Sequence, residues 1–374
     1  MQTRVALAKC DDYAAVGAAL DVVMAPLGGW GAFVKPGQTV LVKPNLLSHH
    51  APDEAVTSHP ELLRAILRRL KTQGVTPVVA DCPANAARLD QVWDATGVAA
   101  LCREELVPLL NLEKAGARSF EVDGMRFSVA TPILEADVVI NVPKVKTHML
   151  TTFTGAVKNM YGAVPGFQKT SLHKVYPRPR EFGELVAAVY GQVKPALSIA
   201  DAVVGMEGDG PSAGQPIRLG FLAASADAAA LDAVLCGILR IDPRRVCYLG
   251  PVARRRLGET DGARIETVGP APDDLAPPAF RMPGMLPLDR IPLWLLGLAR
   301  PLIWHRPRFG ERCVHCGECV RACPTEALRL RPGRRPVLTP SRCVECCCCH
   351  EICPARAVEM AASPLLRFGH WLRH

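Results

Sequence analysis

Short apolar runs alternate with longer amphipathic segments along the first 280 residues of the chain. Five runs are apolar at nearly every position: Thr39–Lys43, Thr76–Asp81, Asp137–Val142, Ala196–Asp201 and Arg218–Ala223. Continuous apolar runs of this length are typical of strands that are buried on both faces of a parallel sheet. The pattern therefore predicts an α/β domain, in which a mostly parallel sheet is flanked by helices.

Helix signals separate these runs. The sequence Ser58-His-Pro-Glu61 combines a capping box with an early proline, and Gly74 follows the last apolar position, so a helix is predicted between them. Further helices are predicted over Glu181–Val193 and Ala226–Leu239. Asp123-Gly124, between two short alternating runs, predicts a β-hairpin.

The chain changes character near residue 280. Residues 1–280 are electrically neutral, whereas the remainder has fifteen arginines, no lysine and seven acidic residues, a net charge of +8. Ten of the fifteen cysteines lie between Cys313 and Cys353. These shifts predict an α/β domain over residues 1–272, a proline-rich and apolar linker over 273–305 and a small cysteine-rich module over 306–374.

Neither a signal peptide nor a membrane span is expected. The first residues lack the long apolar core of a secretory signal. Ile291–Ala299 is an apolar run of nine residues between two arginines, and a spanning helix needs about 20. We therefore expect a cytoplasmic location, where cysteines bind metal rather than form disulfides. A peripheral membrane contact through Leu293–Trp304 stays open.

Two cysteine cassettes, thirty residues apart, carry the strongest chemical signal. Each reads C-x2-C-x2-C-x3-C and is followed by proline. Three thiolates at this spacing can hold three corners of a 4Fe-4S cubane, while the cysteine before the proline ligates the other cluster in two-cluster ferredoxins. The spacing therefore predicts a small α+β ferredoxin-like module with two 4Fe-4S clusters. One cluster would be held by Cys313, Cys316, Cys319 and Cys353, and the other by Cys343, Cys346, Cys349 and Cys323.

Zinc is the alternative cofactor, but structural zinc sites pair two C-x-x-C hooks and do not use the third cysteine or the C-P pair. Cys347 and Cys348 fill the spacer positions of the second cassette, and we expect them to point away from the cluster. Persulfide carriage, a redox-sensing pair and an altered ligand register remain alternatives for these two thiols.

Polar residues gather where the predicted strands end, which is where open parallel sheets bind ligands. In an extended segment, Lys144, Lys146 and His148 alternate onto one face. Two cations and one group that titrates near neutrality could hold a carboxylate or phosphate and move a proton. The candidate catalytic residues are therefore His148 and Lys146. The candidate substrate-binding residues are Lys43, Asn45, Asp81, Lys144, Lys158, Asn159 and Glu207.

Two loops have weaker signals. Gly205–Gly214 is acidic and rich in glycine, so it could carry Mg²⁺ or close over a substrate, or it could be an ordinary surface loop. Lys169–Arg180 is basic, as a nucleic-acid groove would be. One basic loop on a neutral domain makes nucleic acid an unlikely partner.

The cysteine-rich module is strongly basic. Such a face would steer an acidic electron donor, such as a ferredoxin or flavodoxin, toward the clusters. Raising the cluster potential, contact with anionic lipid and a merely solvated surface are the alternatives. Its arginines are Arg306, Arg308, Arg312, Arg321, Arg329, Arg331, Arg334, Arg335, Arg342 and Arg356.

Several short motifs in a fixed order resemble the domain-of-unknown-function 362 family. They are Val42-Lys43-Pro44-Asn45, Thr57-Ser58-His59-Pro60, Ala80-Asp81, Asn141-Val-Pro-Lys144-x-Lys146-x-His148, Gly155-x-x-Lys158-Asn159 and Gly205-x-Glu207-Gly208-x-Gly210-Pro211. The resemblance covers about residues 38–250 and the tail. It implies an α/β domain joined to iron–sulfur clusters, with no assigned reaction.

Three functions fit these features. The first is a reductase, in which the clusters pass electrons to a small anionic substrate anchored by Lys43, Lys144, Lys146 and Lys158, with His148 as the proton donor. The second is a non-catalytic electron-transfer or cluster-maturation partner of another protein. The third is a sensor in which cluster oxidation alters ligand binding at the sheet.

Overall fold

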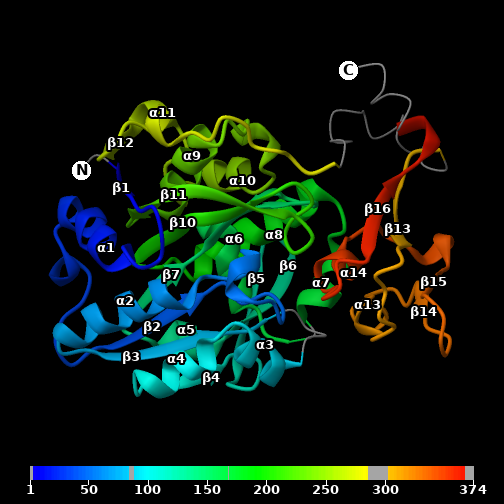
Figure 1. Ribbon diagram of the computed structural model, residues 1–374, viewed down its shortest axis with the longest axis horizontal. Coiled ribbons are helices and arrows are strands. Elements are labelled where there is room, and N and C mark those ends of the chain that lie inside the picture. The colour runs from blue at the N-terminus through cyan, green and yellow to red at the C-terminus, as the bar shows by residue number, and fades with distance from the viewer. Residues whose placement is uncertain (1–2, 84–87, 167, 285–301, 367–374) are drawn as a thin grey trace.

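The computed structural model describes residues 3–83, 88–166, 168–284 and 302–366, and places the α/β domain beside the small module (Figure 1). Much of the predicted linker 273–305, including Ile291–Ala299, lies outside the described residues. In the described ranges, no helix combines the length and apolar character that a membrane crossing requires.

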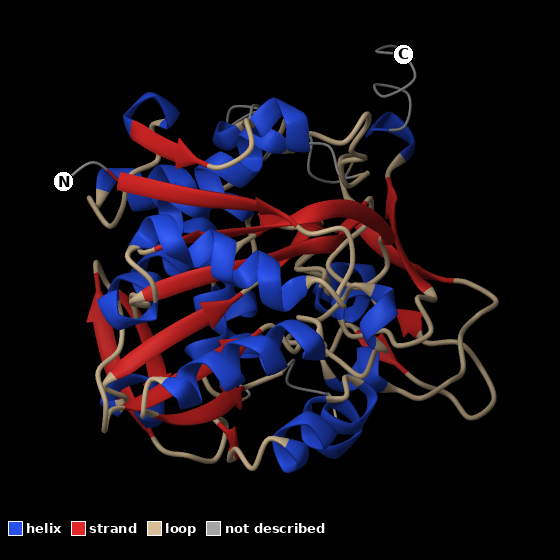
Figure 2. Cartoon of the chain, turned by 60° about the vertical axis from the view of Figure 1, so that its left-hand side comes forward, coloured by secondary structure: helices blue, strands red, loops and turns tan. Residues whose placement is uncertain are grey.

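A mostly parallel sheet forms the centre of the α/β domain (Figure 2). Only β11 runs against its neighbours β1 and β10 along the main strand order, and the other neighbouring pairs are parallel. The sheet therefore confirms the predicted architecture. The spatial order is β12 (Ile265–Val268), β1 (Thr3–Lys9), β11 (Gln215–Ser225), β10 (Leu197–Glu207), β7 (Val138–Val142), β2 (Thr39–Pro44), β3 (Thr76–Asp81) and β4 (Leu109–Asn111).

All five predicted strands are present, and two of them are longer than their apolar runs. β10 continues to Glu207 and β11 begins at Gln215, because the two strands pair antiparallel as far as these residues. β8 (Lys144–His148) pairs with β10, and the short β9 (Thr152–Thr154) pairs with β8. The ladder of β10 and β11 carries the chain beyond the edge of the sheet toward the module (Figure 1).

Helices cover both faces of the sheet. On β2, Val40 and Val42 pack in one core, and Leu41 packs in the core of the opposite face. Successive side chains of a strand point to opposite faces, so an uninterrupted apolar run supplies both cores. The first core includes residues of α1 (Val16–Met24), α2 (Pro60–Thr72) and α4 (Val98–Glu104), and the second includes residues of α8 (Pro179–Gln192), α9 (Ala228–Ile238) and α10 (Leu249–Arg254).

The start of α2 differs from the predicted capping box. His59 is the N-cap, and its Nδ1 accepts the N–H of Glu61 at 3.2 Å. Ser58 Oγ instead donates to the carbonyl oxygen of Val142 at 2.6 Å and accepts the N–H of Asn45 at 2.8 Å. Ser58 therefore ties the loop after β2 to the end of β7. The predicted hairpin is confirmed as β5 (Ala117–Val122) and β6 (Met125–Ala130).

The module repeats its own backbone after thirty residues. α13 (Glu318–Arg321) follows Gly317, whose φ is 76°, and α14 (Cys348–Glu351) follows Cys347, whose φ is 64°. Its strands form two antiparallel pairs, so the predicted α+β module is confirmed. These pairs are β13 (His305–Phe309) with β16 (Val358–Ala362) and β14 (Leu328–Arg329) with β15 (Val337–Leu338).

Polar and apolar contacts hold the module against the α/β domain. The polar contacts are Arg356–Glu54 at 2.8 Å, His148–Glu351 at 3.2 Å, His350 Nε2 to the carbonyl oxygen of Asp209 at 2.9 Å, and Ser212 Oγ to the carbonyl oxygen of His350 at 3.3 Å. Met149 of the α/β domain packs with Cys347 and Met360 of the module. The predicted loop Gly205–Gly214 thus begins as the end of β10, and the part after Glu207 supports the module through Asp209 and Ser212.

Candidate functional site between the sheet and the module

A cleft of about 770 Å³, including its open mouth, lies between the carboxyl ends of the central strands and the module. One wall is formed by the ends of β2 and β3 together with residues of the segments 154–162 and 169–173. The facing wall is formed by Ala322, Cys348, Glu351 and Ile352. Ligands of open parallel sheets bind at this edge. The cleft therefore joins the ligand edge of the sheet to the cysteine cassettes.

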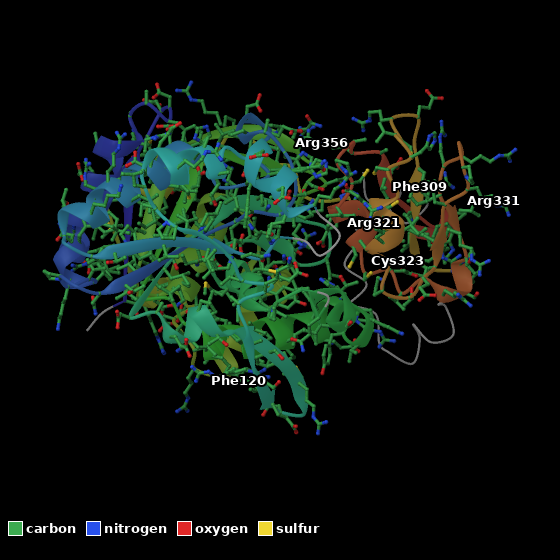
Figure 3. The ribbon with its side chains drawn as sticks, turned by 90° about the horizontal axis from the view of Figure 1, so that it is seen from below. Phe120, Phe309, Arg321, Cys323, Arg331 and Arg356 are labelled. Atoms are coloured by element: carbon green, nitrogen blue, oxygen red, sulfur yellow. The ribbon has the colours of Figure 1, made fainter. Side chains whose placement is uncertain are left out.

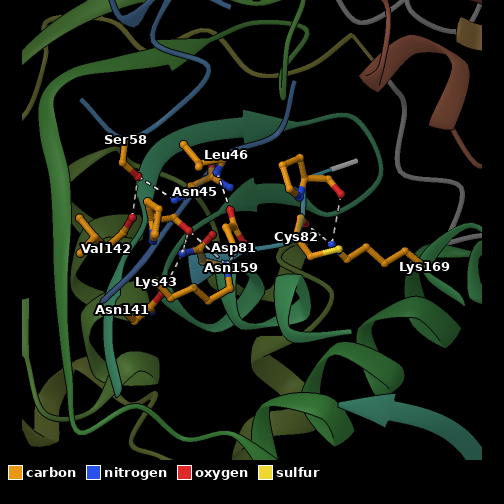
Figure 4. Close-up of polar contacts among 12 residues, drawn as sticks. Lys43, Asn45, Leu46, Ser58, Asp81, Cys82, Asn141, Val142, Asn159 and Lys169 are labelled. Carbon is orange, nitrogen blue, oxygen red and sulfur yellow. Dashed lines mark hydrogen bonds and ion pairs between the residues drawn. The ribbon is translucent and has the colours of Figure 1, made fainter. Parts of the chain in front are cut away.

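Lys43 and Asp81 form a buried ion pair at one end of the cleft, with 2.7 Å between Nζ and Oδ1 (Figure 4). They end neighbouring parallel strands, so their side chains leave the sheet at the same edge. Asp81 Oδ2 also accepts the N–H of Leu46 at 2.7 Å. Burial lowers the pKa of Lys43, while Asp81 opposes this shift. The pair balances its own charge and fixes the loop that follows β2.

Asparagines bring the sheet edge and the following helix together. Asn159 Nδ2 donates to Asn141 Oδ1 at 2.8 Å and to the carbonyl oxygen of Pro44 at 3.3 Å, and Asn141 Nδ2 donates to the carbonyl oxygen of Ala156 at 2.9 Å. Figure 4 shows Asn141 and Asn159 beside Lys43. These bonds hold the residues around Lys158 against the strand ends.

Besides Glu351 Oε1, three polar atoms of the cleft wall are buried without a hydrogen-bond partner among the described residues. They are Asn45 Oδ1, Thr154 Oγ1 and His173 Nδ1. Leaving a buried polar atom unsatisfied costs about 1–3 kcal/mol. Atoms of this kind in one cleft are suited to a polar ligand.

Lys158 supplies a positive charge that no described acidic side chain pairs at ion-pair distance. It lies on α6 (Ala156–Asn159), whose first N–H groups donate to the buried carboxylate of Asp232 at 2.5 and 3.0 Å. Burial lowers the pKa of Lys158, and Glu351 across the cleft is the strongest opposing group. Lys169 adds a second ammonium, which donates to the carbonyl oxygens of Cys82 and Pro83. The α/β wall of the cleft is therefore cationic.

Other predicted site residues lie outside the cleft wall. Lys144 is buried against Asp201 at 3.0 Å and the hydroxyl of Tyr13 at 2.8 Å. Lys146 Nζ donates to the carbonyl oxygen of Val56 at 2.5 Å. Glu207 accepts the backbone N–H of Arg281 at 2.8 Å and its Nε–H at 2.6 Å. Of the nine predicted catalytic and substrate-binding residues, the cleft brings together Lys43, Asn45, Asp81, Lys158 and Asn159.

His148 is held by backbone bonds behind the cleft. Its Nδ1 accepts the N–H groups of Leu150 at 3.1 Å and Thr151 at 3.4 Å, so the ring proton sits on Nε2, which faces Glu351. Burial, followed by the charges of Lys158 and Lys146, lowers the pKa of His148 well below its usual value. Burial thus disfavours the imidazolium form of His148.

Sequence reasoning did not include several residues that line the cleft. Lys169 and His173 belong to the basic segment that was predicted as a loop, and they lie on the helix α7 (Gln168–Val175). Cys348 lines the cleft and Cys347 lines the cavity enclosed by the second cassette. Thr154, Tyr161 and Glu351 are further polar additions.

A second cavity, of about 330 Å³ including its open mouth, lies in the module. It is lined by all four thiols of the second predicted ligand set, Cys323, Cys343, Cys346 and Cys349. The N–H of Ala327 donates to Cys323 Sγ at 3.2 Å, and hydrogen bonds to the sulfurs are one means of tuning a cluster. These residues fit a cubane that is held at its corners.

The first ligand set is also gathered in space. Burial, with the neighbouring thiols Cys353, Cys316 and Cys313, raises the pKa of Cys319 to about 12. The N–H of Ala357 donates to Cys353 Sγ at 3.2 Å, which repeats the bond at Cys323. Cys353 thus lies with the first cassette although it belongs to the second. No three His, Cys, Asp or Glu side chains of the described ranges converge as ligands of one metal ion would.

Comparison with known proteins gives matches over both parts of the chain. The family described as "Domain of unknown function (DUF362)" matches residues 40–237, and the 4Fe-4S dicluster domain family matches residues 312–357. The thylakoid-associated protein sll1697 of Synechocystis sp. is 34% identical over 276 residues, which cover 73% of this chain and 85% of that protein. A solved structure, the lactate racemase apoprotein of Thermoanaerobacterium thermosaccharolyticum, matches with 15% identity and a TM-score of 0.41, over 64% of this chain and 58% of that one.

Proposed function

The chain belongs to the domain of unknown function 362 family and ends in a 4Fe-4S dicluster domain, and we propose that it is a reductase for a small anionic substrate. The dicluster domain indicates iron–sulfur electron transfer. In the proposal, two 4Fe-4S clusters are held by the interlocked cysteine sets, and the substrate binds in the cleft. Thiolate-bound clusters suit a reducing compartment, so the proposed site of action is the cytoplasm.

This proposal rests on the wall that separates the cleft from the second ligand set of the module. Ala322 and Cys348 line the cleft, and each directly precedes a cysteine of the second ligand set, Cys323 or Cys349. An electron that leaves this set therefore has only the wall of the module to cross before it reaches a molecule in the cleft. A carrier that delivers electrons elsewhere would have no need for a polar cleft at this position.

The charge of the cleft selects the substrate class. Lys158 and Lys169 face it, whereas Lys43 is balanced by Asp81. A carboxylate or phosphate is the complement of two ammonium groups. The unpartnered atoms of Asn45, Thr154 and His173 would bind the rest of the molecule. Lys146 and His148 lie behind this wall, so we assign them positioning roles, in which His148 orients Glu351.

A reoxidation assay tests the proposal. The protein is purified anaerobically, reduced with dithionite, freed of excess reductant and mixed with a panel of small carboxylic acids and phosphate esters. Uncharged amides and alcohols of the same carbon skeletons serve as matched controls. Reoxidation of the visible absorbance that saturates with one acid, and is absent with its uncharged counterpart, supports a reductase. Equal rates for acid and control, or no reoxidation by any acid, contradict it and favour a carrier role.

A further inference from the structure

Three exposed arginines lie near the first cysteine cassette. Each is anchored by one hydrogen bond to a backbone carbonyl oxygen near the first ligand set. The bonds run from Arg312 to Arg356 at 2.9 Å, from Arg321 to Cys316 at 3.1 Å and from Arg335 to Phe309 at 3.3 Å. A guanidinium that is tethered by one N–H keeps its remaining donors free for a partner, in a fixed planar geometry.

These arginines have no acidic partner within ion-pair distance among the described residues. Several exposed arginines of the α/β domain, by contrast, pair with acidic side chains. Arg126 pairs with Glu121 at 2.8 Å, Arg218 with Asp11 at 3.4 Å, and Arg244 with Asp242 at 2.9 Å. The uncompensated charge is thus concentrated on the module. Figure 3 shows Arg331 at the outer edge of the module and Arg356 on the side that faces the α/β domain, where it pairs with Glu54.

Exposed apolar side chains lie close in sequence to these arginines. Val314, between Cys313 and Cys316, has 66% of its surface exposed. Leu330 is 38% exposed, and its side chain and that of Arg321 both approach Gly317. An apolar centre within a polar rim is the usual anatomy of a protein–protein interface. We name the surface formed by Arg312, Val314, Arg321, Leu330 and Arg335 the arginine port.

We propose that the arginine port docks a small acidic one-electron carrier protein, which gives its electron to the iron–sulfur centre behind Val314. The carrier is oxidised by one electron and the centre is reduced by one, with no bond made or broken and no proton required. Carboxylates of the carrier pair with the guanidiniums, because the planar fork of arginine matches a carboxylate. The electron thus enters at the first cassette, while the cleft that would receive it borders residues next to the second.

Charge complementarity and position favour a redox protein over a lipid surface. Arg312 and Val314 of the port lie on the loop that carries Cys313 and Cys316, and Arg321 bonds to the carbonyl oxygen of Cys316, so a docked carrier comes close to a thiolate-bound centre. Electrostatic steering raises association rates between oppositely charged proteins and fades as salt is added. The proposal therefore predicts a docking rate that is fast, depends on salt and requires these three arginines.

The test compares two triple variants with equal loss of positive charge. One carries Arg312→Ser, Arg321→Ser and Arg335→Ser, and the control carries Arg126→Ser, Arg218→Ser and Arg244→Ser. Their binding to an acidic plant-type ferredoxin and to an acidic flavodoxin is measured by stopped flow and by calorimetry. Basic cytochrome c and vesicles with anionic phosphatidylglycerol are the comparison partners. Iron content and visible absorbance show that each variant keeps its module folded.

We expect the port variant to bind at least one acidic carrier ten-fold more slowly at about 0.1 M salt, with the difference lost near 1 M because the Debye length shrinks from about 10 to 3 Å. The control variant should stay within two-fold of the wild type. The proposal would be overturned if both variants were slowed equally, or if cytochrome c bound as well as the acidic carriers. Binding to the vesicles alone would also overturn it. The assay contains no cleft ligand, so its outcome is independent of the reductase proposal.

Discussion

His148 Nε2 lies 3.2 Å from Glu351 Oε1, and this contact joins the end of β8 to the segment between Cys349 and Cys353. The two residues come from different parts of the chain, and both are largely buried. Backbone N–H groups fix the ring on one side and the module meets it on the other. The contact therefore brings a histidine that is held by the backbone against Glu351, which lines the cleft.

Replacing His148 should weaken the folded protein. In His148→Ala, the N–H groups of Leu150 and Thr151 lose their acceptor, and a buried unsatisfied group costs about 1–3 kcal/mol. His148→Asn offers a side-chain oxygen to the same N–H groups and should recover part of this loss. Anaerobic urea titrations of the three proteins measure the free energies of unfolding. Equal stability of the alanine variant and the wild type would show that the contact does not hold the fold.

His173 should make the protein less stable in mild acid. Burial, with a smaller effect of Lys158, lowers the pKa of His173 to about 3, while a histidine of the unfolded chain titrates near 6.5. Between these values only the unfolded state binds the proton. The contribution of His173 to the free energy of unfolding is therefore complete above about pH 6.5, and it declines as the pH falls toward 3.

The variant His173→Phe isolates this effect. Phenylalanine can keep the stacking on Phe182, where the ring centroids are 4.3 Å apart, and the edge contact with Tyr161. It removes one titrating group, so the slope of unfolding free energy against pH near pH 5 should fall by about 1.4 kcal/mol per pH unit. The slope is obtained from urea titrations between pH 5 and 7. An unchanged slope would mean that His173 is protonated in the folded state.

Iron content separates the ligand cysteines from the spacer cysteines. Cys347 has the same left-handed conformation as Gly317 thirty residues earlier, and Cys348 lines the cleft. Cys347→Gly and Cys348→Ala should therefore keep the wild-type iron content of about eight atoms for two cubanes. Cys346→Ala, which removes a thiol of the second cavity, should lower it to about four. Loss of iron from either spacer variant would reveal a different ligand register.

The parallel sheet could be predicted because strands buried on both faces leave a direct mark on the sequence, as in Thr39–Lys43 and Thr76–Asp81. Lys43, Asn45 and Asp81 could be predicted as neighbours of a ligand because they follow such strands. The alternation of Lys144, Lys146 and His148 indicates a shared face, but alternation carries no information about what covers that face. Here Asp201, Val56 and Glu351 cover it.

The contribution of the module to the cleft could not be predicted. Cys348 and Glu351 reach the cleft only because the module docks on the sheet edge. That docking depends on contacts between distant residues, such as Arg356 with Glu54, which leave no periodic signal. The cysteine spacing, by contrast, is set by local ligand geometry, so the ligand sets could be proposed from sequence.

The central claim is that anions receive electrons in the cleft beside Lys158. Its most direct test is the rate at which the acid found in the reoxidation screen oxidises the reduced wild type, Lys158→Met and Lys174→Met, in which an exposed lysine of α7 is the matched control. We expect the second-order rate constant to fall at least about ten-fold in Lys158→Met and to stay unchanged in Lys174→Met. The fall follows because a hydrogen bond to a charged group contributes about 1.5–3 kcal/mol. Equal rates in all three proteins would contradict the claim.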